Sequence, residues 1–310
     1  MKILVTGGAG FIGSNLADFL VKSDHKVVII DDFSTGKREN LSEYEKKIEV
    51  IEEKVEDFDL TLLNGINAVV HLAAQVSVPL SISNFKKSST TNLISSLNIF
   101  DYCAQNKLPL IYASSSAVYG EMELGDDEDV SVDLMTPYAV DKYALELYSK
   151  VLWKLNGLSS IGLRFFNVYG PRQDPSSPYS GVISIFIDRI INEIEVDING
   201  GNQTRDFVYI DDVTRSIYKS LILCQKNCVN HNINILTGYE SSINELFNTI
   251  SNEIDVPTTK IFKPMQAGDP FKSNGTSKKM QELLGLDIKS FISLDEGLRR
   301  TIKFMSNVRG

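Results

Sequence analysis

A tyrosine and a lysine four residues apart, Tyr138 and Lys142, are the residues whose types and spacing point most directly to chemistry. A spacing of four places both side chains on one face of a helix. An unperturbed tyrosine titrates near pH ~10 and is a poor base at neutral pH, but an adjacent ammonium stabilises the phenolate and lowers that pKa. The pair therefore predicts a general base, although a solvated helix face would give the same spacing.

Three serines, Ser114–Ser116, follow an apolar segment upstream of this pair. A hydroxyl at the end of a strand can hydrogen-bond a substrate oxygen and hold it beside a base. The alternative is a polar turn with hydroxyl caps. Together with the tyrosine and the lysine, the serines predict proton transfer at a substrate oxygen.

A glycine-rich segment near the start of the chain, GGAGFIG at 7–13, has the spacing of a dinucleotide-binding turn. Gly7 allows a tight turn, Gly10 lets the backbone approach a pyrophosphate, and Gly13 lets helix and strand pack closely. The N-terminus of the following helix attracts the anion. An ordinary glycine turn is the alternative, but the apolar run before the segment and the helical pattern after it favour a dinucleotide.

An acidic residue, Asp31, lies 18 residues beyond Gly13 at the end of the second apolar run. A carboxylate at this place accepts hydrogen bonds from the adenosine ribose and repels a 2′-phosphate. We therefore expect NAD rather than NADP, although Lys37 and Arg38 nearby leave NADP open. In such a site Lys142 would also bind the nicotinamide ribose.

The elements that must position these residues alternate between strands and helices in the first half of the chain. Apolar runs predict strands at 2–6, 26–30, 48–51, 68–74, 110–113 and 161–164, and helical periodicity predicts helices at 11–22, 85–105 and 138–155. Repeated strand–helix units form a parallel sheet with helices on both faces.

The pattern changes after Gly170, where residues 171–181 are rich in Pro, Ser and Gly and predict a long functional loop. Further helices are predicted at 184–192, 211–224 and 242–253, and a last helix begins with a capping box at Ser293 and Glu296. We expect an α/β fold, a Rossmann-type doubly wound parallel sheet with a smaller, mixed C-terminal cap. Residues 1–170, with about 208–238 returning to them, would bind the dinucleotide, and 171–207 with 239–310 would cover the carboxyl edge of the sheet, where such folds bind ligands.

Composition narrows the class of protein. The 310 residues can bury a large core, and a net charge of −9 without a dense Lys and Arg cluster argues against a nucleic-acid partner. Three cysteines without a CxxC pair indicate free thiols in a reducing compartment, and three isolated histidines argue against a metal site. No segment has the length of a membrane span, and the first apolar run is too short for a signal peptide. We predict a cytoplasmic enzyme without a membrane partner.

Several longer motifs carry a family resemblance: TGGAGFIG (6–13), HLAAQ (71–75), SSSAVYG (114–120), YAVDK (138–142), LRFFNVYGPRQDP (163–175), RDFVYIDDV (205–213) and AGDP (267–270). On these motifs the chain resembles the extended short-chain dehydrogenases/reductases, and within them the UDP-sugar 4-epimerases. The resemblance extends from Lys2 to about Met305. It implies NAD as cofactor, a UDP-sugar as substrate, and a homodimer built on the helices at 85–105 and 138–155.

The resemblance also implies a role for individual residues. Tyr138 would be the base, Lys142 its partner and Ser115 the catalytic hydroxyl, with Ser114 and Ser116 as neighbours that a shifted alignment would select. The implied cofactor-binding residues are Gly7, Gly10, Phe11, Ile12, Gly13, Asp31, Asp32, Val55, Leu72, Ala73, Ala74, Tyr138, Lys142 and Phe166. The implied substrate-binding residues are Ser115, Asn167, Val182, Arg205, Asp269 and Ser273. For two of them the alternatives are a structural Arg205–Asp206 ion pair and a core position for Val182.

The chain departs from the family pattern at three places. Glu53-Lys54 stands where the family often has Gly-Asp, which leaves the adenine contact open. Gln266 stands where the family has an arginine that contacts the diphosphate. Ser273 replaces a bulky tyrosine found in relatives restricted to unacetylated sugars, so we expect acetylated and plain hexoses as substrates.

The reaction implied by the resemblance inverts C4 of the sugar. Tyr138 would remove the 4-hydroxyl proton while C4 gives a hydride to NAD, the 4-keto sugar would turn, and the hydride would return to the opposite face. A dehydratase or decarboxylase would place an acid just after the catalytic hydroxyl, where this chain has Ser116 and Ala117. A UDP-glucuronate 4-epimerase stays open, and an NAD-binding sensor would commonly lack the Tyr or the Lys.

Overall fold

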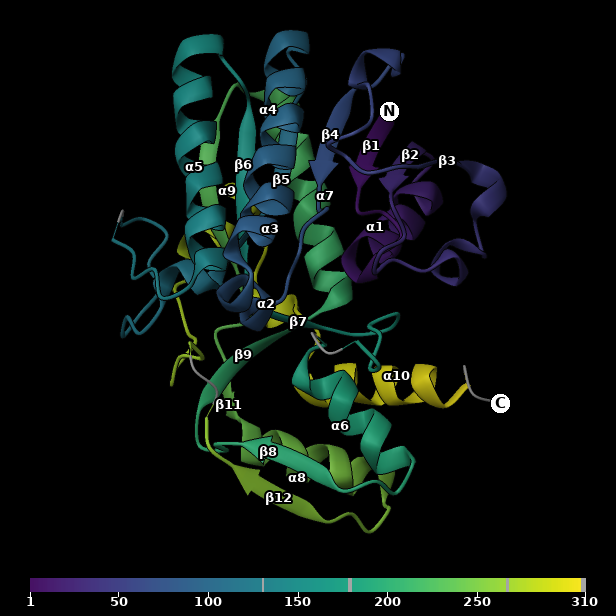
Figure 1. Ribbon diagram of the computed structural model, residues 1–310, viewed down its shortest axis with the longest axis vertical. Helices are drawn as coiled ribbons and strands as arrows, with labels where there is room; N and C mark the ends of the chain where they lie inside the picture. Colours follow the sequence, from purple (N-terminus) through teal and green to yellow (C-terminus); the bar gives the residue numbers. More distant parts are fainter. Residues whose placement is uncertain (130, 178–179, 266–267, 308–310) are drawn as a thin grey trace.

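A seven-stranded parallel sheet forms the larger part of the structure, a computed structural model that describes residues 1–129, 131–177, 180–265 and 268–307 (Figure 1). Its strand order is β10-β6-β5-β4-β1-β2-β3, and every neighbouring pair is parallel. The strands are β1 (Lys2–Thr6), β2 (Lys26–Asp31), β3 (Ile48–Glu52), β4 (Ala68–His71), β5 (Leu110–Ser115), β6 (Ser160–Phe165) and β10 (Asn230–Ile235). The predicted parallel α/β sheet is thus confirmed.

Helices cover both faces of this sheet because alternate strand residues point to opposite sides. Ile3 and Val5 belong to the apolar cluster that includes α1 (Phe11–Lys22) and α7 (Ile210–Lys226). Leu4, between them, belongs to the cluster formed with α4 (Ser95–Asn106) and α5 (Pro137–Asn156). The central strands are therefore buried on both sides, which explains why they are continuous apolar runs.

Helix α5, which carries the Tyr and Lys pair, has well-defined ends. Thr136 caps it, since its side chain accepts from the Ala139 N–H, and Pro137 is its first residue. Gly157 ends it with φ of 70°, a left-handed conformation that glycine adopts without strain. These signals fix where Tyr138 stands, one residue into the helix.

The single helix predicted at 85–105 is interrupted. It consists of α3 (Phe85–Ser89), a π-helical turn at Thr90–Ile94 and α4, and a short α2 (Val78–Ser83) precedes it. Asn92 in the π turn accepts from the Gln75 N–H at 2.7 Å and donates to the Gln75 carbonyl at 2.9 Å. The turn therefore holds the segment that follows β4.

The rest of the chain forms two small sheets with helices, below the large sheet in Figure 1. One combines β7 (Asn167–Tyr169), β9 (Thr204–Tyr209) and β11 (Glu240–Ser242) with parallel and antiparallel pairing, and the other pairs β8 (Val196–Asn199) with β12 (Lys260–Lys263). The helices are α6 (Val182–Ile191), α8 (Ile243–Ile254), α9 (Lys278–Leu284) and α10 (Leu294–Asn307). The smaller, mixed part is confirmed, although its short strands were not predicted individually.

Two of these helices, α8 and α10, directly follow a serine whose hydroxyl accepts from a backbone N–H. A complete capping box begins α8, where Ser242 and Glu245 satisfy each other's backbone N–H groups. At α10 the Ser293 hydroxyl accepts from the Glu296 N–H at 3.4 Å, but the Glu296 carboxylate pairs with Arg300. The predicted box at 293–296 is therefore only half formed.

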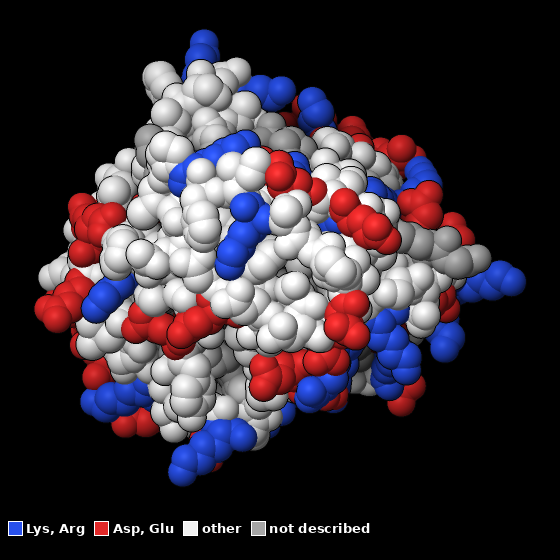
Figure 2. Space-filling view, turned by 90° about the horizontal axis from the view of Figure 1, so that it is seen from below, with Lys and Arg blue, Asp and Glu red and all other residues white. Residues whose placement is uncertain are grey.

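Two further features concern the surface. Acidic and basic side chains are interspersed over the face shown in Figure 2. No helix among the described residues is long and apolar enough to cross a membrane.

Candidate active site

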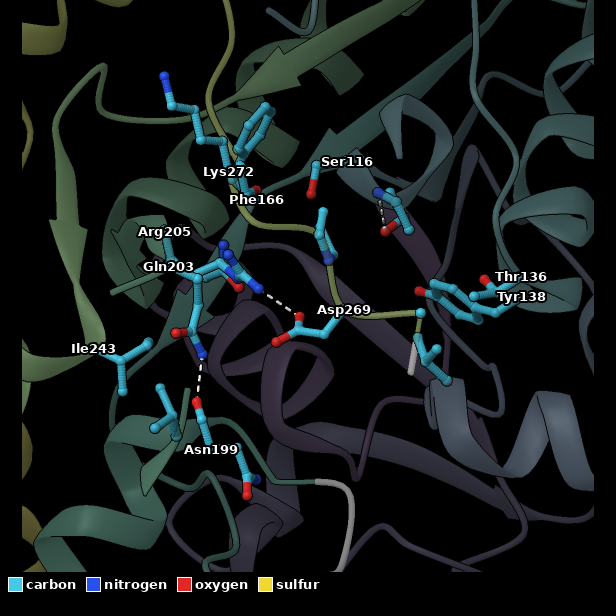
Figure 3. A pocket seen from close by; sticks show the side chains of 18 of the residues that line it. Ser116, Thr136, Tyr138, Phe166, Asn199, Gln203, Arg205, Ile243, Asp269 and Lys272 are labelled. Atoms are coloured by element: carbon cyan, nitrogen blue, oxygen red, sulfur yellow. Dashed lines mark hydrogen bonds and ion pairs between the residues drawn. The ribbon is translucent and has the colours of Figure 1, made fainter. Parts of the chain in front are cut away.

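A cavity of about 610 Å³ opens at the carboxyl end of β5 and β6, between the large sheet and the small ones (Figure 3). Ser115 and Phe165, the last residues of these two strands, lie in its lining. The structure brings all the predicted substrate residues together there, and Tyr138 and Phe166 with them: Ser115, Asn167, Val182, Arg205, Asp269 and Ser273. The volume lies within the range of small-molecule sites.

Tyr138 and Ser115 meet at one end of this cavity. Their side chains share a hydrogen bond, and the Ser115 Oγ accepts from the Ala117 N–H at 3.1 Å. Lys142 Nζ lies 5.7 Å from the centre of the Tyr138 ring and donates to the Ala113 carbonyl at 2.8 Å. The hydroxyl, the phenol and the ammonium therefore form one contiguous group.

Burial acts on both titratable groups. It lowers the pKa of Lys142 to about 8, opposed by the negative charge of Asp141. It raises the pKa of Tyr138, opposed by the hydrogen bond from Ser115. The sequence predicted that Lys142 would lower the Tyr138 pKa; in the structure burial raises that pKa, and the interaction that opposes the rise is the hydrogen bond with Ser115.

The three serines have different surroundings. Ser114 is buried, and its Oγ donates to Glu146 Oε1 at 2.6 Å, away from the cavity. Ser115 and Ser116 both line the cavity. The geometry therefore favours Ser115, the serine that also contacts Tyr138, as the hydroxyl beside the base.

The glycine segment fits a dinucleotide pyrophosphate. Gly7 has φ of 67°, and a Cβ there would stand 2.7 Å from the Ala73 nitrogen. A Cβ on Gly13 would stand 2.1 Å from the Gly7 carbonyl oxygen, so both glycines are required by packing. A Cβ on Gly10 would meet only the Gly7 oxygen, at 3.3 Å, among the described atoms within 4 Å. Gly10 thus leaves room beside the N-terminus of α1, where an anion is stabilised.

The Asp31 carboxylate stabilises the glycine segment through hydrogen bonds. It accepts from the Ala9 N–H at 2.8 Å and the Phe33 N–H at 2.9 Å. Burial raises its pKa, and these backbone hydrogen bonds oppose the increase. The carboxylate therefore orders the turn.

The two cations near Asp31 are already compensated. Lys37 Nζ lies 2.7 Å from the Asp174 carboxylate, and Arg38 pairs with Glu52. Neither is left as an unpaired charge for a 2′-phosphate. This arrangement favours NAD over NADP.

Residues 72–74 follow β4 and are partly buried. The Thr6 hydroxyl oxygen accepts from the Leu72 N–H at 3.2 Å and the Ala73 N–H at 3.3 Å, and it lies 2.7 Å from His71 Nδ1. His71 Nε2 lies 2.8 Å from Ser96 Oγ, and burial lowers the His71 pKa to about 3. A neutral histidine therefore helps to hold this segment.

The remaining predicted cofactor residues have varied surroundings. Val55 is buried in the apolar cluster of the sheet, so its side chain belongs to the core. Asp32 is exposed and accepts from the Ser34 hydroxyl at 2.6 Å. Phe11 and Ile12 are partly buried and pack against the core at the start of α1.

The other end of the cavity carries the charged residues. Arg205 donates to Asp269 at 2.5 Å, and both line the cavity (Figure 3). Asp206 instead accepts from Thr237 and Gly238, so the alternative Arg205–Asp206 ion pair is not formed. Gln266 lies outside the described residues.

Several lining residues were missed from the sequence, among them Thr136, Arg189, Asn199, Gln203, Ile243 and Lys272. Gln203 folds back, accepting from Gly201 and donating to the Asn199 carbonyl, each at 2.6 Å. The Gly200-Gly201 pair before it was the only signal of this turn. Within the described part of the chain, no group of three or more His, Cys, Asp or Glu side chains could hold a metal ion.

Comparison with known proteins agrees with this geometry. The model of the NAD dependent epimerase/dehydratase family matches residues 3–235. UDP-glucose 4-epimerase of Thermotoga maritima, solved with UDP-glucose, is 34% identical, with a TM-score of 0.92 and 100% of both chains covered. UDP-N-acetylglucosamine 4-epimerase of Methanobrevibacter ruminantium M1, solved with UDP-N-acetylmuramic acid, is 36% identical, with a TM-score of 0.90 over 99% of this chain and 98% of that one.

A third structure contains the cofactor. UDP-glucuronic acid 4-epimerase of Bacillus cereus, solved with UDP-glucuronic acid and NAD, is 32% identical, with a TM-score of 0.90 over 99% of this chain and 100% of that one. The chain belongs to the NAD dependent epimerase/dehydratase family, as an NAD-dependent isomerase.

Proposed function

We propose that this enzyme inverts C4 of neutral UDP-hexoses, both UDP-glucose/UDP-galactose and UDP-N-acetylglucosamine/UDP-N-acetylgalactosamine. The observation that carries the proposal is a single cavity with Tyr138 at one end and Arg205 at the other, Ser115 being hydrogen-bonded to Tyr138. A nucleotide sugar has its reacting hydroxyl and its diphosphate at corresponding ends. Binding energy at the diphosphate can then hold the substrate while the sugar reacts.

The residues at the Tyr138 end suit removal and return of one proton. Ser115 hydrogen-bonds the 4-oxygen, and Tyr138, as the phenolate, accepts the 4-hydroxyl proton and later returns it. Bound NAD would supply the acceptor for the C4 hydride and the donor for its return. Lys142 Nζ lies 5.7 Å from the centre of the Tyr138 ring, where it would hold the cofactor ribose and place a positive charge near the phenolate.

The acidic side chains of the cavity argue against elimination. Among the described lining residues only Asp197 and Asp269 are acidic, and both are paired, with Lys263 at 2.7 Å and with Arg205. Ser116 and Ala117 line the cavity just after Ser115, where a dehydratase or decarboxylase would need an acid. Epimerisation is the reaction these groups support.

The cationic side chains favour an uncharged sugar. Of the described lining residues Arg189, Arg205 and Lys272 are cationic. Arg205 is paired with Asp269, and Arg189 donates to the Glu195 carbonyl. Lys272 points away from Tyr138 in Figure 3. Lys272 therefore does not provide a cation for a uronate carboxylate near Tyr138.

Ser273 supports acceptance of an acetamido group. It lines the same cavity as Tyr138, and its small side chain leaves room where a tyrosine would project. Its hydroxyl can donate to the acetamide carbonyl. The relative that acts on UDP-N-acetylglucosamine shows that this fold can serve acetylated sugars.

We also propose a homodimer. Exposed apolar side chains form one stripe along α5: Val140, Leu147, Tyr148, Val151 and Leu155. Their spacing places them on one side of the helix.

Two other expectations stay predictions from the sequence. They are a cytoplasmic location and the division into 1–170 with 208–238 and 171–207 with 239–310.

The test is incubation of the purified enzyme with UDP-glucose, UDP-N-acetylglucosamine and UDP-glucuronate, with products identified by NMR. We expect 4-epimers from the first two. Conversion of UDP-glucuronate alone, or release of CO₂ from it, would contradict the proposal.

A further inference from the structure

A buried ion pair lies behind the cavity, between α5 and β6. Glu146 stands one helical turn beyond Lys142, and Arg164 stands on β6; both are 3% exposed. The guanidinium donates twice, from Nη2 to Glu146 Oε2 at 2.6 Å and from Nε to Oε1 at 2.8 Å. Such a bidentate pair is strong and geometrically specific.

The Glu146 carboxylate also holds the serine strand. Ser114 Oγ donates to Oε1 at 2.6 Å, and Asn232 Nδ2 donates to Oε2 at 3.0 Å. Ser114 directly precedes Ser115, and Glu146 is on the helix that carries Tyr138. One carboxylate therefore ties the end of β5 to the helix of the base.

Arg164 binds the far end of the segment 114–119, which begins at Ser114 and ends at Tyr119. Its Nη1 donates to the Tyr119 hydroxyl at 2.7 Å, which donates to Asn234 Oδ1 at 2.7 Å. Asn234 Nδ2 donates to the Thr276 carbonyl at 3.1 Å, three residues beyond Ser273. The pair thus contacts both ends of the segment 114–119 and reaches the segment that bears Ser273.

We propose that Glu146 and Arg164 are positioning residues that set the distance between the Ser115 hydroxyl and the Tyr138 phenol. The inference rests on the proposed function, because it requires those two side chains to act on the sugar. A buried ion pair adds little net stability compared with an apolar replacement. A displacement of about 1 Å at the reacting groups, by contrast, costs about 10²-fold in rate.

The test compares two buried serines that each bond α5 to the sheet. Ser114→Ala removes the bond to Glu146. Ser149→Ala is the control: Ser149 is fully buried on α5, its Oγ lies 2.8 Å from Ser160 Oγ, and it accepts from Asn230 Nδ2 at 2.6 Å. Both variants should lose a similar, small amount of thermal stability.

Only the first variant should lose rate. We expect Ser114→Ala to lower kcat about tenfold with KM changed by less than about twofold, and Ser149→Ala to keep both values within about twofold. Equal kcat values for the two variants, or a change in KM without a change in kcat, would overturn the inference.

A second variant tests the route through the carboxylate. Glu146→Met combined with Ser114→Ala should lower kcat no further than Glu146→Met alone, since each change removes the Ser114–Glu146 hydrogen bond. Multiplicative losses would overturn the inference, and the serine comparison decides it if Glu146→Met does not fold. Normal turnover by Tyr138→Phe would defeat the proposed function. If Tyr138→Phe is inactive but Ser114→Ala and Ser149→Ala have the same kcat, only the positioning role is defeated.

Discussion

Replacing Ser273 by tyrosine should separate acetylated sugars from plain ones. The Ser273 side chain lines the cavity that holds Tyr138, and its carbonyl accepts from the Asp206 N–H at 3.2 Å. The neighbouring Phe271 carbonyl accepts from the Thr204 N–H at 3.0 Å, so the backbone is held against β9. A phenol ring at 273 would therefore project into the cavity.

The magnitude follows from what the ring excludes. An acetamide that clashes with the ring or loses its hydrogen bond should cost about 10²-fold in kcat/KM, or about 3 kcal/mol. A plain hexose has no group at that place, so its kcat/KM should change by less than about fivefold. Ser273→Ala is the matched control: it keeps the room and loses one hydrogen bond, which is worth about 1 kcal/mol.

The assay measures initial rates with UDP-N-acetylglucosamine and UDP-glucose by NMR for the unmodified enzyme and both variants. We expect a selective loss of the acetylated substrate in Ser273→Tyr and a smaller loss in Ser273→Ala. Equal losses on both sugars would make Ser273 a structural residue. No turnover of acetylated sugars by the unmodified enzyme would refute the reasoning outright.

Three further predictions concern the cofactor, pH and assembly. The enzyme should release NAD on denaturation, identified by mass spectrometry, and release of NADP alone would contradict the account. Gly10→Ala should stay folded but lose most of its NAD. Gly13→Ala should destabilise the fold, because its Cβ would stand 2.1 Å from a carbonyl oxygen. Because the His71 pKa is lowered to about 3 from 6.5, the unfolded chain binds the proton first, so the free energy of unfolding should fall as the pH drops from 6.5 toward 3. His71→Gln should flatten that fall in urea titrations, and an unchanged pH profile would argue against a neutral buried histidine. Leu147→Glu should convert the proposed dimer to a monomer in light scattering, because Leu147 is 49% exposed on the apolar stripe of α5, and a monomeric unmodified enzyme would remove the prediction.

The sequence predicted the parts of the fold that local pattern determines. The strands at 2–6 and 110–113 are continuous apolar runs, and close backbone contacts require glycine in the glycine segment. Both features could therefore be recognised in the sequence. The strands after residue 165 were not predicted, and they include β10 of the large sheet and β9. The others, β7, β8, β11 and β12, have only three or four residues, and such short strands carry no clear pattern. The π turn at 90–94 was missed because it continues the helix on both sides and differs from it in its hydrogen-bond spacing.

The site was predictable where resemblance or spacing pointed to it. Tyr138, Ser115 and Arg205 do converge on one cavity. The Glu146–Arg164 pair was missed, although Arg164 was a charged residue inside a buried strand run and Glu146 follows Lys142 by four residues. Their partnership depends on how α5 packs on β6, which no local pattern encodes.

The central claim is that Tyr138 is the base of an NAD-dependent C4 epimerisation, and Tyr138→Phe tests it most directly. The variant keeps the ring and loses only the hydroxyl that Ser115 contacts. Turnover of UDP-glucose should fall about 10²–10⁴-fold, the range for loss of a general base, while bound NAD and the UDP-glucose Kd change far less. Turnover near that of the unmodified enzyme would contradict the claim.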